Sequence, residues 1–267
     1  WTLDFFRAHC NVSVVLNRRN PKSENWGRLE KAGRLFLADF IDTFVSDLTR
    51  RKWYLHDWSL PRNCPEVFGP APFSGFTVPK YFAGDYFQRA GFEGYQHTWP
   101  SLFIGSNETQ SSMHIDSGNT HFMLHLLSGR KEWRFYAAKD LINLYMSPTS
   151  SRFHYDVFRP DKEKFPLARY AEQFLGIQKE GDTIFIPAAN PHAVRNLDPI
   201  HGISMNYVDA SNVQLSILER IWEMQGDDVE LYTDGTSIPH GLISAQPHMS
   251  FGEWKAQDWK RIKYDLF

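Results

Sequence analysis

The middle of the chain, from about Leu102 to Tyr207, alternates short apolar runs with polar turn residues. Gly, Asn, Asp, Ser and Pro separate the runs, and these residues favour turns. Many short strands with turn signals between them predict an all-β sandwich or barrel. The runs expected to form strands are Leu102–Ile104, His121–Leu127, Glu132–Tyr136, Thr183–Ile186 and Gly202–Tyr207.

The flanks of this region have a different pattern. Residues 29–48 carry apolar side chains at helical spacing with a polar opposite face, which predicts a helix packed outside a sheet. Residues 212–225 return to helical spacing, whereas residues 59–80 are rich in Pro and Gly and predict a long surface loop. The apolar stripe of the second helix consists of Leu215, Leu218 and Trp222.

These patterns predict three segments along the chain. Residues 1–100 form a helical and β flank that is integral to the fold, residues 101–210 form the β core, and residues 211–267 form a helical extension. A chain of 267 residues can bury a sizeable core without stapling.

Charge and cysteine content narrow the function classes. The 29 Lys and Arg residues nearly balance 31 Asp and Glu, so global attraction to nucleic acid or acidic membranes is not expected, although a local basic patch is compatible with this balance. No apolar run is long enough to span a bilayer. Cys10 and Cys64 form no disulfide framework, and reduced thiols predict a cytoplasmic or nuclear location.

The first candidate for chemistry is His114-x-Asp116, which lies in a β-like context. Residues i and i+2 of a strand face the same side, so the imidazole and the carboxylate can converge. One more imidazole would complete a facial triad of two histidines and one carboxylate, which suits a non-heme Fe(II) oxygenase.

The second candidate is His192, which follows a turn at Gly181-Asp182, a buried strand over Thr183–Ile186 and a strand-ending Pro187. This order places the imidazole just past a strand end, where a ligand at the rim belongs. Taken alone, His192 is equally a loop histidine, and His114 is equally a buried polar residue with satisfied hydrogen bonds.

A series of motifs in a fixed order resembles the JmjC hydroxylases, a branch of the cupin-like oxygenases, over roughly Trp1 to Tyr207. The resemblance implies a mainly β fold, a double-stranded β-helix (jelly-roll) barrel with flanking N- and C-terminal helices. The matching motifs are Tyr54-Leu55-x-Asp57-Trp58, Val78-Pro79-x-Tyr81-Phe82, His114-x-Asp116, Gly129-Arg130-Lys131-x-Trp133, Asp156-x-Phe158-x-Pro160-Asp161, Phe165-Pro166, Gly181-Asp182-Thr183-x-Phe185-Ile186-Pro187, His192-x-Val194-x-Asn196 and Ser204-x-Asn206-Tyr207.

The resemblance also implies the roles of the site residues. His114, Asp116 and His192 would be the catalytic metal ligands for Fe(II), with 2-oxoglutarate and O2 as co-substrates. The co-substrate would contact Lys131 and Tyr54, and further Ser111, Ser204 and Asn206. Two alternatives are that Lys131 is a solvent-exposed neighbour of Arg130 and that Tyr54 is an aromatic core residue.

Two positions depart from the family's pattern. Asn190 stands where the family usually has tryptophan, which changes the rim beside the metal but not a ligand. Phe122-Met123-Leu124 stands where several members carry an asparagine that contacts the co-substrate. His121 and His125 either reach the pocket or are core histidines.

The implied activity is hydroxylation of a side chain of a protein substrate, and demethylation is the same chemistry on an N-methyl carbon. One alternative is an oxygenase acting on a nucleic acid such as tRNA, and another is a non-catalytic metal-binding scaffold. The basic runs that would favour nucleic acid are short. No membrane partner is expected, and a homodimer through the C-terminal helices is a further expectation. The basic runs are Arg18-Arg19, Arg50-Arg51-Lys52 and Lys260-Arg261-x-Lys263.

Overall fold

The computed structural model describes residues 1–46, 52–69, 75–82, 84–88, 97–147, 152–223 and 249–250. The chain groups into two compact units. Unit 1 comprises Trp1–Trp58, Ser101–Ile115 and Met123–Ser204, and unit 2 comprises Ser59–Pro100, Asp116–Phe122 and Met205–Phe267. The predicted segment boundaries after residues 100 and 210 stay a prediction.

Unit 1 contains most of two antiparallel sheets. The larger sheet has seven strands in the order β10-β7-β12-β5-β3-β1-β2, and the smaller has four in the order β6-β11-β8-β9. The strands of the larger sheet are β1 Ser13–Arg19, β2 Leu29–Phe36, β3 Tyr54–Ser59, β5 Ser101–Gly105, β7 His121–Ser128, β10 Thr183–Ile186 and β12 Ile200–Tyr207. Those of the smaller sheet are β6 Gln110–His114, β8 Arg130–Tyr136, β9 Gln173–Lys179 and β11 His192–Asn196.

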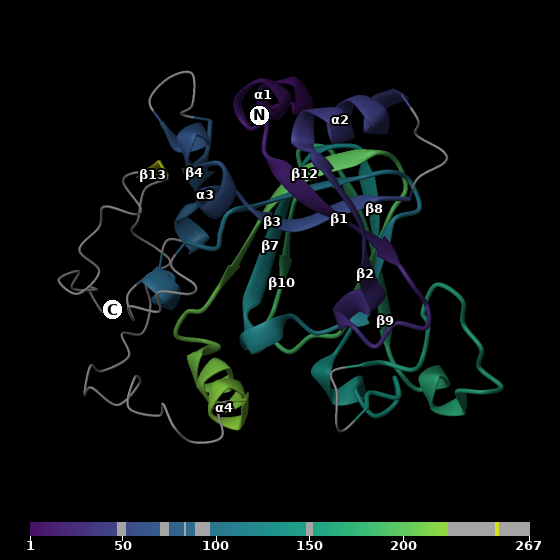
Figure 1. Ribbon diagram of the computed structural model, residues 1–267. Helices are drawn as coiled ribbons and strands as arrows, with labels where there is room; N and C mark the ends of the chain where they lie inside the picture. Colours follow the sequence, from purple (N-terminus) through teal and green to yellow (C-terminus); the bar gives the residue numbers. More distant parts are fainter. Residues whose placement is uncertain are drawn as a thin grey trace. The chain divides into compact units, whose positions relative to one another are not determined.

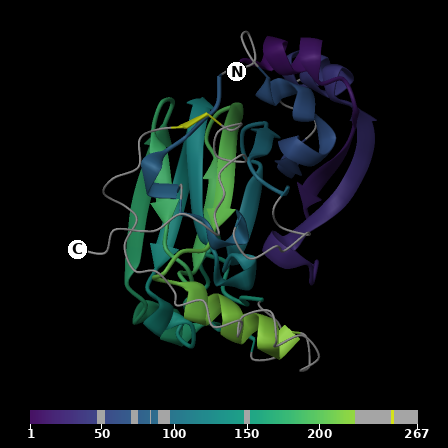
Figure 2. The same ribbon diagram turned by 90° about the vertical axis from the view of Figure 1, so that its left-hand side faces the viewer.

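The buried strands lie in the middle of the larger sheet. Every residue of β5 and β12 is buried, which matches their near-continuous runs of apolar and small residues. The β1–β2 hairpin, drawn in purple, lies at one edge of that sheet (Figure 2). The central core therefore comes from the region in which the sequence pattern is most strongly β.

All five strands expected between residues 102 and 207 are present as β5, β7, β8, β10 and β12. The expected burial of β10 is wrong, because only Ile186 of that strand is buried. The strands that had not been expected include β1, β2, β3, β9 and β11. Strand β9 shows why, since most of its residues are exposed and it pairs along its length with β8. Such strands are stabilised by partners distant in sequence, which a local apolar pattern does not reveal.

The helix expected over residues 29–48 is wrong in its first half. Residues 29–36 form β2, which pairs with β1 in a register that joins Ser13 to Phe36, and the helix among the described residues of this range is α2, Leu37–Ser46. Gly33 lies inside the strand, where the pairing with β1 decides the conformation. The apolar residues between 35 and 44 carried the helical signal. Helix α2 lies beside α1 (Leu3–His9) in Figure 1.

Unit 2 contains short elements. Residues 59–80 are not a purely exposed loop, because Leu60, Val67 and Val78 are fully buried. The expected C-terminal helix is present as α4, Val213–Glu223. The other elements are α3 Leu60–Asn63, β4 Thr77–Val78 paired with β13 Met249–Ser250, and the 3₁₀ turns Pro65–Phe68, Lys80–Phe82, Tyr86–Gln88 and Ser117–Asn119.

Helix α4 is attached to the turn that follows the His-x-Asp motif. The backbone N–H of Gly118 donates to Glu219 Oε1 at 2.9 Å, and Asn212 Nδ2 donates to the carbonyl oxygen of Asn119 at 2.8 Å. Leu215 and Leu218 of the expected stripe are exposed, at 43% and 62%. The tail residues Trp254, Trp259, Tyr264 and Phe267 lie outside the described residues.

Two further expectations concern the whole chain. Across the part of the chain that is described, we find no helix with the length and apolar character needed to cross a membrane. Cys10 and Cys64 are both disulfide-bonded, so the expectation of reduced thiols is wrong. Two widely separated cysteines carry no local signal of pairing. The cytoplasmic or nuclear location that rested on those thiols stays a prediction.

Candidate metal centre

The two histidines of the predicted triad face each other across an antiparallel strand pair. Strands β6 and β11 pair with His114 opposite His192, and the ring centroids are 4.2 Å apart. Further along, Val194 lies opposite Ser111, so three steps on β6 match two on β11. Such a bulge re-aims side chains at functional sites. Here it turns both His114 and Ser111 toward the sheet face that carries His192.

Asp116 completes the group from just beyond the strand. Strand β6 ends at His114, so the expectation that both residues lie on one strand is only partly correct. The backbone at Asp116 is nevertheless extended, with φ −66° and ψ 137°, which keeps the two-residue alternation. Potential ligand atoms of His114, Asp116 and His192 all lie within 4.8 Å of one another.

Each histidine is oriented by a backbone carbonyl two residues earlier. His114 Nδ1 lies 2.6 Å from the carbonyl oxygen of Ser112, and His192 Nδ1 lies 3.0 Å from that of Asn190. A carbonyl can only accept, so both rings carry the proton on Nδ1 and present Nε2 as the ligand atom. This outer hydrogen bond is the usual support of a metal-binding histidine. Because the Asn190 backbone supplies the contact, its unusual side chain leaves the ligand intact.

Burial keeps both rings in the form that binds a metal. Desolvation lowers the pKa of His114 well below its ordinary value, with the neighbouring His192 as a further cause, and burial lowers the pKa of His192 to about 4. Both imidazoles are therefore neutral at pH 7. Two neutral imidazoles with one carboxylate form a donor set that fits a divalent metal such as Fe(II) and leaves positions for other ligands.

Two tryptophans hold the histidine rings. The Trp26 ring centroid lies 4.1 Å from that of His114, and its Nε1 donates to the carbonyl oxygen of Ile115 at 3.1 Å. Trp133 lies 6.1 Å from His192, and its Nε1 donates to Gln178 at 3.0 Å. Trp133 belongs to a motif quoted above, whereas Trp26 lies far from His114 in the sequence and no pattern singled it out.

Lys131 lies in the interior, so its expected burial is confirmed and the surface alternative is wrong. The residue is 1% exposed, and Nζ donates to Tyr54 Oη at 3.2 Å and to Asn196 Oδ1 at 2.9 Å. Asn196 in turn donates to Thr109 Oγ1 at 2.7 Å. The neighbouring Arg130 is exposed and pairs with Asp198. We call Lys131, Tyr54, Asn196 and Thr109 the lysine cluster.

The lysine cluster lacks a counter-charge. Among the described residues no carboxylate pairs with Lys131, and desolvation lowers the pKa of its ammonium group to about 7. Burial raises the pKa of Tyr54, so the phenol keeps its proton and can donate. An ammonium group has three donors, and only two are used here. A buried amine with a spare donor and no anion fits the carboxylate of a ligand.

Gly105 makes room for the cluster. A Cβ atom at this position would lie 2.6 Å from Asn196 Nδ2, 2.7 Å from Thr109 Oγ1 and 2.8 Å from Tyr54 Cδ2. These are packed side chains in a hydrogen-bonded group rather than flexible ends. A side chain at position 105 would collide with these neighbours, so the close packing of the lysine cluster requires glycine there.

His56 is a site residue that the sequence reasoning missed. It follows Tyr54 by two residues on β3, and its ring lies 5.1 Å from that of Tyr54, 4.8 Å from Phe103 and 5.2 Å from Trp26. Burial, and next the charge of Lys131, lower the pKa of His56 to about 3. The ring is thus neutral and lies between the lysine cluster and the Trp26 ring beside His114. The two-residue alternation from Tyr54 is the signal that could have identified it.

Two predicted hydroxyl residues are buried with no hydrogen-bond partner. The Oγ atoms of Ser111 and Ser204 are both unpaired, and so is that of Ser101, which lies opposite Ser204 in the β5–β12 pair. Buried polar atoms without partners are rare and call for an explanation. A polar ligand would satisfy them. Asn206 shares the face of Ser204 by alternation, and its Nδ2 donates to Thr120 Oγ1 at 2.8 Å.

Of the two histidines that had been left open, His121 is buried and His125 is half-buried. His121 Nε2 lies 2.8 Å from Ser211 Oγ, and His125 Nδ1 lies 2.9 Å from Thr183 Oγ1. Within the described part of the chain, neither belongs to the group that could hold a metal.

Comparison with known proteins agrees with this fold. The model of the Cupin-like domain family matches residues 18–210, and the chain belongs to that family. The predicted mainly β, cupin-like fold with short flanking helices is thereby confirmed. A relative from Gallus gallus, "2-oxoglutarate and iron-dependent oxygenase JMJD4", is 26% identical over 170 residues. The match covers 61% of this chain and 37% of the relative, so the chain spans well under half of that protein's length.

Proposed function

We propose that this protein is an Fe(II)- and 2-oxoglutarate-dependent dioxygenase that hydroxylates a side chain of a protein substrate. The main support is the pairing of two features. The triad of His114, Asp116 and His192 can hold a divalent metal, and Lys131 is a buried cation without an anion. The distant relative named as a 2-oxoglutarate and iron-dependent oxygenase supports the same class.

The metal and co-substrates supply the oxidising chemistry: 2-oxoglutarate and O2 become succinate and CO2, and one oxygen atom enters a substrate C–H bond. The chain provides placement. His114, Asp116 and His192 would hold the metal and leave other coordination positions open to ligands. The Nδ1–H groups of the two histidines donate to the carbonyl oxygens of Ser112 and Asn190, and these bonds fix the orientation of both rings.

The remaining residues orient the co-substrate. Lys131 and Tyr54 would donate hydrogen bonds to the distal carboxylate of 2-oxoglutarate, and the charge of Lys131 would compensate that carboxylate. The unpaired hydroxyls of Ser111 and Ser204 give further polar contacts, and Asn206 extends this polar face. Trp26 and Trp133 limit ring motion of the ligating histidines.

A protein substrate is the proposal that follows from the resemblance to small JmjC hydroxylases. Demethylation would need no different site, because hydroxylation of an N-methyl carbon releases formaldehyde. A nucleic-acid substrate and a non-catalytic scaffold are outcomes that the following experiments separate.

The first experiment measures succinate released from 2-oxoglutarate by the Fe(II)-loaded chain without any other substrate. We expect slow turnover that His192→Ala abolishes and that His125→Gln leaves unchanged. His125 is the matched control because it bonds to Thr183 and lies outside the triad. No turnover above that of His192→Ala would favour the scaffold.

The second experiment identifies the substrate. The chain is loaded with an inert divalent metal and an unreactive 2-oxoglutarate analogue, and captured molecules are then treated with the active enzyme. We expect a captured protein to gain the mass of one oxygen atom. The same gain found only on captured RNA would replace the protein substrate with a nucleic acid.

A further inference from the structure

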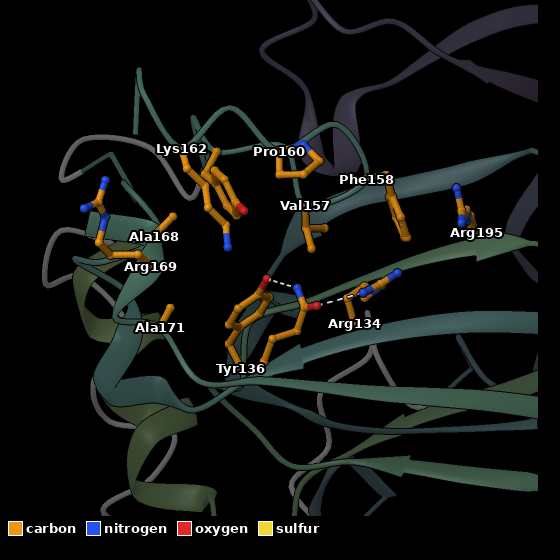
Figure 3. Close-up of a pocket in the computed structure, with 12 residues that line it drawn as sticks. Arg134, Tyr136, Val157, Phe158, Pro160, Lys162, Ala168, Arg169, Ala171 and Arg195 are labelled. Carbon is orange, nitrogen blue, oxygen red and sulfur yellow. Dashed lines mark hydrogen bonds between the residues drawn. The ribbon is translucent and has the colours of Figure 1, made fainter. Parts of the chain in front are cut away.

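A second hollow lies on the opposite face of the four-stranded sheet. Along β8 the side chains alternate, so Lys131 and Trp133 face the interior whereas Glu132, Arg134 and Tyr136 face the other side. A cavity of about 290 Å³ lies on that face (Figure 3). Its lining comes from outward side chains of β8, β9 and β11 and from residues between positions 155 and 171. This volume is near the lower end of the roughly 300–1,000 Å³ that is typical of small-molecule sites.

Four cationic side chains line this cavity, and no carboxylate does. They are Arg134, Lys162, Arg169 and Arg195. The negative charge that partly compensates these cations belongs to Glu132, which is 5% exposed. One of its carboxylate oxygens accepts from Arg134 Nε and the other from Arg195 Nε, both at 2.7 Å. Neither Lys162 nor Arg169 forms an ion pair within the described residues. The cavity therefore carries a surplus of positive charge.

The two arginines that bind Glu132 are held in place before any ligand arrives. Arg134 Nη1 also donates to Gln173 Oε1 at 2.7 Å, and Gln173 Nε2 donates to Tyr136 Oη. Arg195 lies over the Phe158 ring at 5.0 Å. A guanidinium fixed in this way loses little freedom on binding an anion, and its planar fork suits phosphate oxygens.

The rest of the lining is apolar or aromatic. Val157, Phe158 and Ala168 form part of the wall, and Tyr136 stays neutral because burial raises the pKa of its phenol to about 12. In Figure 3, Lys162 reaches from its loop toward the side that Tyr136 lines, whereas Arg134 and Arg195 lie at the end away from Arg169. A ligand would therefore meet Arg134 and Arg195 at one end of the cavity, Lys162 beside Tyr136, and carbon along the wall formed by Val157, Phe158 and Ala168.

We propose that this cavity binds a small phosphate monoester with an aromatic or apolar body. Four cations against one carboxylate favour a dianion over a singly charged carboxylate. The aromatic wall distinguishes the ligand from inorganic phosphate. The site is separate from the metal centre, because it uses the outward residues of β8 and β11, whereas His192 and the lysine cluster use the inward ones.

The test titrates the full chain with phenyl phosphate, inorganic phosphate and benzyl alcohol by calorimetry, with chelator present. We expect saturable binding of phenyl phosphate, at least about fivefold tighter than inorganic phosphate, and no detectable binding of benzyl alcohol. In the Lys162→Gln, Arg169→Gln double variant, we expect phenyl phosphate to bind at least about tenfold more weakly. Lys179→Gln, an exposed lysine on β9 outside the cavity, is the matched control.

The Lys131→Met variant tests whether phenyl phosphate binds at Lys131 instead of in this cavity. We expect this variant to bind phenyl phosphate as well as the wild type does. The proposal is overturned if no phosphate binds, if the double variant binds as well as Lys179→Gln, or if Lys131→Met removes the binding. Because Lys162 and Arg169 are exposed and unpaired, their replacement should leave the thermal midpoint unchanged. A loss of binding then reports on the cavity rather than on folding.

Discussion

The metal centre and the lysine cluster are built in different ways, although β8 and β11 contribute to the surroundings of both. Each ligating histidine is oriented by the backbone carbonyl two residues before it, so its support is local. Lys131 instead depends on Tyr54 from β3, Asn196 from β11 and, behind it, Thr109 from the turn before β6. The orientation of each histidine is thus set locally, although the two rings meet only through the β6–β11 pair, whereas the lysine cluster takes side chains from several strands.

The two regions also differ in what they lack. The metal centre offers a carboxylate and two neutral rings to a cation, whereas the lysine cluster offers a cation to an anion. A molecule with a metal-chelating end and a distant carboxylate would satisfy both regions. This difference in charge allows each region to be disrupted separately.

The largest expected effect is on the metal centre. Asp116→Ala or His192→Ala should remove most binding of Fe(II) or Mn(II), because two remaining ligands hold a divalent ion poorly. Metal content after dialysis measures this effect, with His125→Gln as the control. Equal metal content in the wild type and in the Asp116→Ala, His192→Ala double variant would refute the assignment.

The second effect separates the two regions. Lys131→Met should leave metal binding intact but weaken 2-oxoglutarate by roughly 2–5 kcal/mol, the usual cost of losing one partner of a buried charge pair. The same substitution should raise the thermal midpoint of the free protein, because it removes a buried, uncompensated amine. Arg130→Met, at an exposed neighbour, should change neither property. If Lys131→Met binds 2-oxoglutarate as well as the wild type does, a residue other than Lys131 binds the carboxylate of the co-substrate.

The third effect is a dependence on pH. The pKa of Lys131 is about 7 in the folded chain and near 10.5 when exposed, so the cost of burying its charge grows as the pH falls from about 10.5 to 7. Above pH 7 the free chain must take up a proton to bind a carboxylate. Affinity for 2-oxoglutarate should therefore fall by about tenfold per pH unit above 7. Calorimetry in buffers of different ionisation enthalpy measures the uptake, and a flat profile equal to that of Lys131→Arg would contradict it.

A fourth, smaller effect concerns the space beside the lysine cluster. Gly105→Ala should destabilise the chain by about 1–3 kcal/mol, as overpacking of a filled interior usually does. Its new Cβ would press on Asn196, Thr109 and Tyr54, so 2-oxoglutarate affinity should fall while metal binding persists. Gly33→Ala is the control, because the backbone there has no positive φ and the nearest atom to an added Cβ lies 4.0 Å away. Loss of metal in Gly105→Ala would show that the two regions are not separable.

The smallest effect concerns assembly. Leu215 and Leu218 of α4 are exposed, and we expect them to lie in a homodimer interface. Light scattering should show a dimer for the full chain and a monomer for Leu215→Ser, Leu218→Ser, with metal content unchanged in both. A monomeric full chain, or a dimer that survives the substitutions, would reject this interface.

Short motifs named residues that the structure brings together. The motif series that resembles the JmjC hydroxylases named His114, Asp116 and His192, whose potential ligand atoms lie within 4.8 Å of one another, and one motif named Lys131, which is buried. Trp26 and His56 were missed because only the pairing of distant strands brings them to the site. For the same reason residues 29–36 were expected to be helical, since their pairing with β1 carries no local signal.

The most direct test of the account is a calorimetric titration of 2-oxoglutarate into wild type and Lys131→Met, each with Mn(II) and with chelator. The account predicts tight binding only for the wild type with Mn(II), and weaker binding when either the metal or Lys131 is removed. It also predicts that succinate, which lacks the 2-oxo acid group, depends on Lys131 but not on the metal. Equal 2-oxoglutarate affinity in all four titrations would contradict the claim that the triad and Lys131 hold the two ends of one molecule.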